Sequence, residues 1–139
     1  MSEKIIRSIY EARLAAWAAA RSPVLKVAYE NEKFAPPTDG STYLRCFLLP
    51  ANTDSQDLQG VHEAFLGVFQ VNIVAKAGAG LGAAKGIADE LRALFPNNLR
   101  LTKTGLTVQS ISPCSQASTQ QDTNTATVPV WFNYRADVI

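Results

Sequence analysis

The sequence contains few of the side chains that most often carry out chemistry or bind metals. Its 139 residues include one histidine and two cysteines, and neither a C-x-x-C pair nor a G-x-S-x-G elbow occurs. His62 has no second histidine with which to share a metal, so we expect a solvent-exposed polar residue. Acidic residues fall mainly in expected loops or on exposed helix sides, which leaves no evident acid and base pair. The sequence therefore predicts neither an enzyme nor a cofactor or metal site.

An excess of one charge and a long apolar run are also lacking. The chain carries 13 Lys and Arg against 12 Asp and Glu, with the cations scattered along it. Such a balance offers no footprint for nucleic acid or for an anionic membrane. No apolar stretch approaches the roughly 18 residues of a membrane-spanning helix, and the first residues lack the pattern of a signal peptide. We expect a soluble, cytoplasmic protein with no nucleic-acid specificity and no membrane partner.

The remaining composition is that of an ordinary globular protein. Apolar residues make up 47% and charged residues 18%, and the length suits a single domain over residues 1–139. Cys46 lies in an apolar run, whereas Cys114 lies in a stretch rich in Ser and Gln. We therefore expect one buried thiol, one exposed thiol and no structural disulfide.

Helical periodicity marks the beginning of the chain. Apolar residues recur at helical spacing until Pro23, which predicts an amphipathic helix with its apolar stripe on Ile5, Ile9, Ala12, Ala16 and Ala20. Arg13 falls inside this stripe. Its side chain either extends along its own stem to reach water or contacts a neighbouring subunit.

Two strands with unusual faces follow. Tyr43 to Leu49 alternates with large apolar groups on both faces, and Pro50 is expected to end it. Ala64 to Ala75 is the strongest strand candidate, with Phe65, Phe69, Val71 and Ile73 on one face. Its other face is too apolar for plain solvent and too polar for a closed core, as expected of an interface: Leu66, Val68, Gln70, Asn72 and Val74.

The second half of the chain predicts one more helix and three more strands. A glycine-rich turn leads into a helix that ends at Pro96, and the strands are expected at Leu99–Lys103, Leu106–Ile111 and Thr125–Tyr134. This order indicates an α+β fold, a mixed and mainly antiparallel β-sheet flanked by two α-helices. Pro129 removes one ladder donor, so the last strand is expected at a sheet edge or bulged.

A polar stretch separates the last two strands. Residues 112–125, SPCSQASTQQDTNT, contain almost no apolar side chain and are expected to be mobile in the free protein. The stretch is either an arm that becomes ordered against a partner or a solvated hairpin tip.

A nucleotide site is the strongest enzymatic alternative. Gly78, Gly80 and Ala83 form a G-x-G-x-x-A pattern between a strand and a helix, where a pyrophosphate could approach. About 20 residues further on, where an acidic residue should meet the ribose, the sequence lacks Asp and Glu. A turn that feeds the helix is the favoured interpretation, and a small nucleotide-binding enzyme remains the alternative from another class.

Seven segments in order resemble one family, the tail terminator-like proteins of tailed phages and prophages. They are VAYEN (27–31), FAPP (34–37), YLRCFLLPA (43–51), GVFQVNIV (67–74), AGAG (77–80), IADELRALFP (87–96) and VPVWFNYR (128–135). The resemblance covers nearly the whole chain. Ala77 stands where the family often has proline.

The resemblance implies a virion structural protein with no catalytic residue. Such proteins form a ring, hexameric in the best-known relatives, on the head-proximal end of the tail tube, where they stop tube growth and provide the head-joining surface. The implied partners are copies of itself, the tail-tube protein and a head completion or connector protein, met in the host cytoplasm before the virion forms. Another head-tail connector or tail-tube component is the alternative. Candidate subunit contacts are Arg13, Phe47, Gln70, Asn72 and Trp131, and candidate tube contacts are Gln116, Gln120, Gln121 and Asp122.

Overall fold

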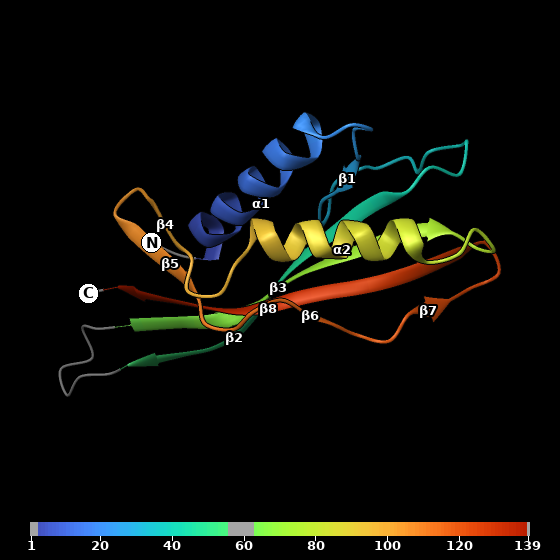
Figure 1. Ribbon diagram of the computed structural model, residues 1–139. Helices are drawn as coiled ribbons and strands as arrows, with labels where there is room; N and C mark the ends of the chain where they lie inside the picture. Colours follow the sequence, from blue (N-terminus) through green and yellow to red (C-terminus); the bar gives the residue numbers. More distant parts are fainter. Residues whose placement is uncertain (1–2, 56–62, 139) are drawn as a thin grey trace.

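A computed structural model describes residues 3–55 and 63–138 as two helices and eight strands; His62 lies outside these ranges. Figure 1 shows the elements in chain order. They are α1 (Glu3–Ala20), β1 (Val27–Ala28), β2 (Tyr43–Ser55), β3 (Glu63–Lys76), α2 (Gly82–Leu94), β4 (Arg100–Lys103), β5 (Leu106–Ser110), β6 (Ser115–Gln116), β7 (Gln120–Gln121) and β8 (Thr125–Val138).

The strands form one sheet in the order β1-β2-β3-β8-β5-β4, with β6 and β7 also paired to β8. The pair β1 and β2 is parallel, and the other pairs are antiparallel. Both helices lie on the same face of this sheet (Figure 1). The expected α+β class, with a mixed and mainly antiparallel sheet and two helices, is confirmed. No helix of the described residues is both long and apolar enough to span a bilayer.

An aromatic cluster fills the space between the helices and the sheet. The ring of Tyr10 on α1 lies 5.2 Å from that of Phe69 and 5.1 Å from that of Phe132, centroid to centroid. Phe95, just after α2, stacks on Phe132 at 5.1 Å. Such pairs add to the stabilisation that burial of the rings provides. The cluster fixes both helices to the two central strands, β3 and β8.

The buried face of α1 differs from the expected stripe. Ala12, Ala16 and Ala20 are exposed, whereas the side chains that face the core are Ile6, Ile9, Tyr10, Leu14 and Ala18. Burial free energy scales with apolar area, so Tyr10 and Leu14 outweigh a stripe of alanines. Spacing alone weighted the small residues as if they were large ones.

Two prolines lie inside strands, where the sequence predicted a strand end at Pro50 and an edge or bulged strand at Pro129. Pro50 does not end β2, which continues to Ser55 with a register shift between Pro50 and Thr53. Pro129 does not put β8 at an edge, because β3 pairs with one side of β8 and β5 to β7 with the other. The carbonyl of Pro129 accepts a hydrogen bond from the Ala117 amide. Because the nitrogen and the carbonyl of one residue in an antiparallel strand point to the same edge, the nitrogen of Pro129 also faces this side, between β6 and β7. The missing donor therefore falls where the partner strand is interrupted.

The polar stretch before β8 is ordered against that strand. β6 pairs with Val130 and Trp131, and β7 pairs with Ala126 and Thr127. A structureless arm is therefore wrong for this part of the chain, and the alternative of a hairpin tip fits the turn between β7 and β8. Cys114 is buried rather than exposed, and its thiol lies 3.5 Å from the carbonyl oxygen of Phe95 at the end of α2. Cys46 is buried as expected, and both cysteines are free.

Candidate interaction surface

The face of the sheet turned away from the helices carries large side chains that neither α1 nor α2 covers. We call this face the open face. Along β3 its residues alternate with the fully buried Phe69, Val71 and Ile73, and Leu66, Val68, Gln70 and Asn72 are half-buried. Its members from the three long strands are Tyr43, Arg45, Phe47, Leu49, Leu66, Val68, Gln70, Asn72, Val74, Thr127, Pro129, Trp131, Asn133 and Arg135.

Strand register brings four of the five predicted interface residues together. Phe47 on β2 stands opposite Gln70 on β3, and Gln70 stands opposite Trp131 on β8. The side-chain amide of Gln70 donates to Oδ1 of Asn72 at 2.7 Å, which joins this row to the next one along the strand. The open face therefore has an amide pair at its centre with one aromatic ring on each side.

This composition suits contact with another protein. Aromatic and arginine side chains are enriched in interfaces, while lysine and glutamate are depleted from their cores. On the open face, Leu49 remains 45% exposed and Arg45 lies over the ring of Tyr43 at 5.9 Å. Arg135 is paired with Asp137 at 3.0 Å near one border of the face. The sequence placed Val68 on this face, but the candidate contacts drawn from it do not include Arg45 or Leu49, although the same two-residue alternation marks them.

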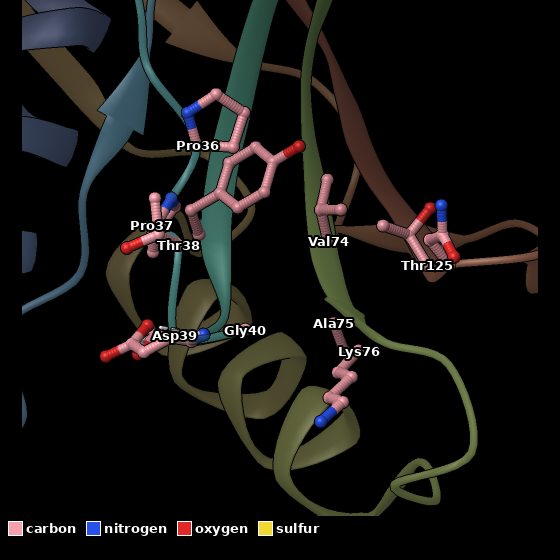
Figure 2. Close-up of a pocket in the computed structure, with 12 residues that line it drawn as sticks. Pro36, Pro37, Thr38, Asp39, Gly40, Val74, Ala75, Lys76 and Thr125 are labelled. Carbon is pink, nitrogen blue, oxygen red and sulfur yellow. Dashed lines mark hydrogen bonds between the residues drawn. The ribbon is translucent and has the colours of Figure 1, made fainter.

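A loop closes one end of the open face. The ring of Phe34 packs 5.2 Å from that of Tyr43, and Asp39 accepts hydrogen bonds from both the amide and the hydroxyl of Ser41. These bonds lower the pKa of the Asp39 carboxyl and hold the turn. The resulting hollow has a volume of about 550 Å³. It lies between residues 36–41 on one side and Val74 to Lys76 with Thr125 on the other (Figure 2). The uncovered part of the face therefore begins beyond Tyr43.

Arg13 lies apart from the other predicted interface residues. It is half-buried on α1, and its Nε donates to the carbonyl oxygen of Leu94 at 2.9 Å. This carbonyl belongs to the last turn of α2, where a cation compensates unpaired acceptors and the helix dipole. The structure thus places Arg13 between the two helices, in a contact within the chain that the sequence did not indicate.

The four predicted tube contacts lie along the edge of β8. Gln116 accepts a hydrogen bond from Lys85 of α2 at 3.1 Å, and its strand-mate Ser115 stands opposite Trp131. Gln120, Gln121 and Asp122 are exposed. The segment therefore borders the open face on its β8 side.

The glycine-rich segment has the geometry of a turn. Gly78 and Gly80 adopt φ angles of +84° and +80°, which glycine accepts without strain, and a Cβ at either would meet nothing within 4 Å. They are needed for their backbone conformation and not for a close approach. β3, which precedes them, runs antiparallel to both of its neighbours, unlike a strand of a dinucleotide-binding unit. Within residues 3–55 and 63–138, no cluster of three metal-ligating side chains occurs.

The fold and the open face define a class: small α+β proteins whose sheet carries aromatic and amide side chains on the face that the helices leave uncovered. The family model described as phage tail terminator protein matches residues 5–134. The chain therefore belongs to the phage tail terminator family, a family of structural proteins, and has a structural role in the phage tail.

Comparison with solved structures agrees with this assignment. One solved protein is 42% identical, with a TM-score of 0.85 over 100% of this chain and 98% of its own. None of the curated proteins matches the sequence.

Proposed function

We propose that this chain works as a single domain that assembles into a ring on the head-proximal end of the phage tail tube. The ring stops tube growth and provides the surface to which the head joins. The observation that carries this proposal is the row Phe47, Gln70 and Trp131 across an uncovered sheet face. Covering a surface of this kind with a protein partner lowers the free energy.

Ring formation requires two different surfaces on each subunit, because a head-to-tail contact repeats around a closed circle. The open face supplies one of them, and the other lies on a different part of the neighbouring copy. By analogy with the family's best-known relatives the ring is a hexamer. Residues 116–122 are proposed to contact the tail-tube protein, and a head completion or connector protein binds the opposite side of the ring.

The proposed role needs recognition alone, without catalysis, a cofactor or sequence-specific nucleic-acid binding. Assembly takes place in the host cytoplasm, and the product is part of the virion. Free chains are expected to be largely monomeric at micromolar concentration, with the tube end acting as the template that raises the local concentration of subunits.

A stop codon early in this gene tests the proposal. The mutant phage should make DNA-filled heads and separate tails, with tube lengths that are irregular or excessive, because the growing end is never capped. Electron microscopy of the lysate measures both features. A plasmid copy of the intact gene is the control and should restore joined particles. Complete, infectious particles with normal tails in the mutant lysate would show that the chain is no terminator.

A further inference from the structure

The outer edge of β2 is covered by a very short strand. β1 pairs with β2 only at Leu44 and Arg45, and the Leu44 amide donates to the carbonyl oxygen of Lys26 at 2.9 Å. The chain then leaves the sheet in a turn, where Asn31 has a φ of 58° and the Glu32 amide approaches the carbonyl of Tyr29. Backbone pairing of β1 with this edge therefore ends well before β2 does.

Beyond the end of β1, a side chain instead of the backbone binds the edge of β2. The carboxylate of Glu30 accepts a hydrogen bond from the backbone amide of Leu48 at 2.8 Å. Amides at alternate positions of a strand point to the same edge, so Leu44 and Leu48 both donate outward. Pro50, two residues further, has no amide hydrogen to offer. Glu30 thus stands where the next carbonyl of a longer β1 would stand.

Arg7 of α1 holds this carboxylate in position. Its guanidinium donates to Oε1 of Glu30 at 2.9 Å and to Oε2 of Glu11 at 3.3 Å. The Arg7 and Glu30 side chains are 34% and 32% exposed, so the pair is only partly screened by solvent. A charged acceptor on a backbone amide is stronger than a neutral one. The contact connects the helix, the turn after β1 and the edge of β2.

We propose that Glu30, held by Arg7, closes the edge of β2 against the addition of a strand from a second copy of the chain. Residues 43–49 read YLRCFLL, with six apolar residues, one charge and no proline, which is a composition prone to strand pairing. Identical chains carry identical edges, and two such edges can pair antiparallel about a two-fold axis. Because β1 is two residues long, loss of the Glu30 contact also loosens β1 and frees the edge from Tyr43 onward.

The pair of variants Glu30→Ala and Glu32→Ala tests the proposal in the isolated protein. Glu32 is an exposed carboxylate on the same turn, so its replacement changes the charge equally. Glu30→Ala should associate with rising concentration in sedimentation velocity, and the Leu48 amide of its monomer should exchange about tenfold faster. Glu32→Ala should stay dispersed like the parent chain. Protection of the amides of Phe69 to Ile73 shows that each variant is folded.

Two further variants keep the test decisive. Glu30→Gln retains an oxygen that accepts the Leu48 amide and should remain dispersed, whereas Arg7→Met should associate to an intermediate degree. If Glu30→Ala is poorly folded, Arg7→Met decides by the same measurement. Equal association of Glu30→Ala and Glu32→Ala, or association of Glu30→Gln as strong as that of Glu30→Ala, would refute the proposal. Neither result bears on the ring, because no tail tube is present in these experiments.

Discussion

Two tyrosine hydroxyls of the core have opposite surroundings. That of Tyr134 donates to Oε2 of Glu3 at 2.8 Å, and its ring lies over Gly67, where a Cβ would come within 2.7 Å of the ring. The hydroxyl of Tyr10 is buried and has no hydrogen-bond partner among the residues that the structure describes. Burial raises the pKa of both phenols. One hydroxyl therefore contributes to stability, and the other is tolerated.

Replacement of each tyrosine by phenylalanine measures this difference. Tyr10→Phe removes a buried polar group and should leave the free energy of unfolding unchanged or raise it by up to about 1 kcal/mol. Tyr134→Phe should lower it by about 1–2 kcal/mol, because it removes a bond to a carboxylate. Urea unfolding of the two variants beside the parent chain gives both values. A larger loss from Tyr10→Phe than from Tyr134→Phe would contradict this account.

Because two thiols are buried, we expect the free energy of unfolding to fall at alkaline pH. Burial raises the pKa of Cys46 to about 12 and that of Cys114 to about 11. In the unfolded chain a thiol ionises near pH 8.5, so above that pH the folded state holds protons that the unfolded state has released. The contribution of each thiol to the free energy of unfolding is therefore complete below about pH 8.5. It falls by up to about 1.4 kcal/mol per pH unit as the pH rises toward the pKa of that thiol in the folded state. Urea midpoints at pH 8, 9 and 10 should fall less steeply in the double variant Cys46→Ala, Cys114→Ala.

At the scale of elements, the short strands beside β8 predict a graded pattern of amide protection. The Ala117 amide donates to Pro129 at 3.0 Å and the Asp122 amide to Thr125 at 2.8 Å. These two amides should exchange more slowly than those of Ser118 and Thr119, and faster than those of Phe69 to Ile73 in the centre of the sheet. Hydrogen exchange followed by NMR checks all three groups. Uniformly fast exchange over residues 115–122 would contradict this expectation and support the mobile arm that the sequence indicates.

Sequence patterns located the long elements and failed where tertiary partners decide. The alternation of β3 gave both of its faces, because a strand buried on one side must alternate. The polar stretch before β8 gave no such signal, since β6 and β7 owe their order to the neighbouring strand and not to apolar content. Cys114 was misplaced for the same reason: its burial depends on α2, which packs over it. The face of α1 was misjudged because spacing ignores side-chain size.

At the scale of the whole molecule, the candidate surface was predictable only in part. Phe47, Gln70, Asn72 and Trp131 could be named from alternation, but their meeting in adjacent rows depends on the strand order β2-β3-β8. Nothing in the sequence shows that β8 pairs with β3 across the intervening helix and strands. Arg13 was grouped with them by its position in an apolar stripe, and the structure places it on the helical side instead.

A substitution on the open face tests whether that face joins the ring. Trp131→Glu places a carboxylate beside Gln70 on a half-buried position of the open face, so the chain should still fold. Burying that charge against a neighbouring subunit without a partner would cost several kcal/mol, and assembly should fail.

Arg92→Glu on the exposed side of α2 is the matched control, because it also adds negative charge but lies on the opposite side of the sheet. Supplied from a plasmid to phage with the stop codon, Arg92→Glu should restore joined particles and Trp131→Glu should leave heads and overlong tails apart. Full rescue by a folded Trp131→Glu protein would remove the open face from the interface, whatever the role of the chain in the tail.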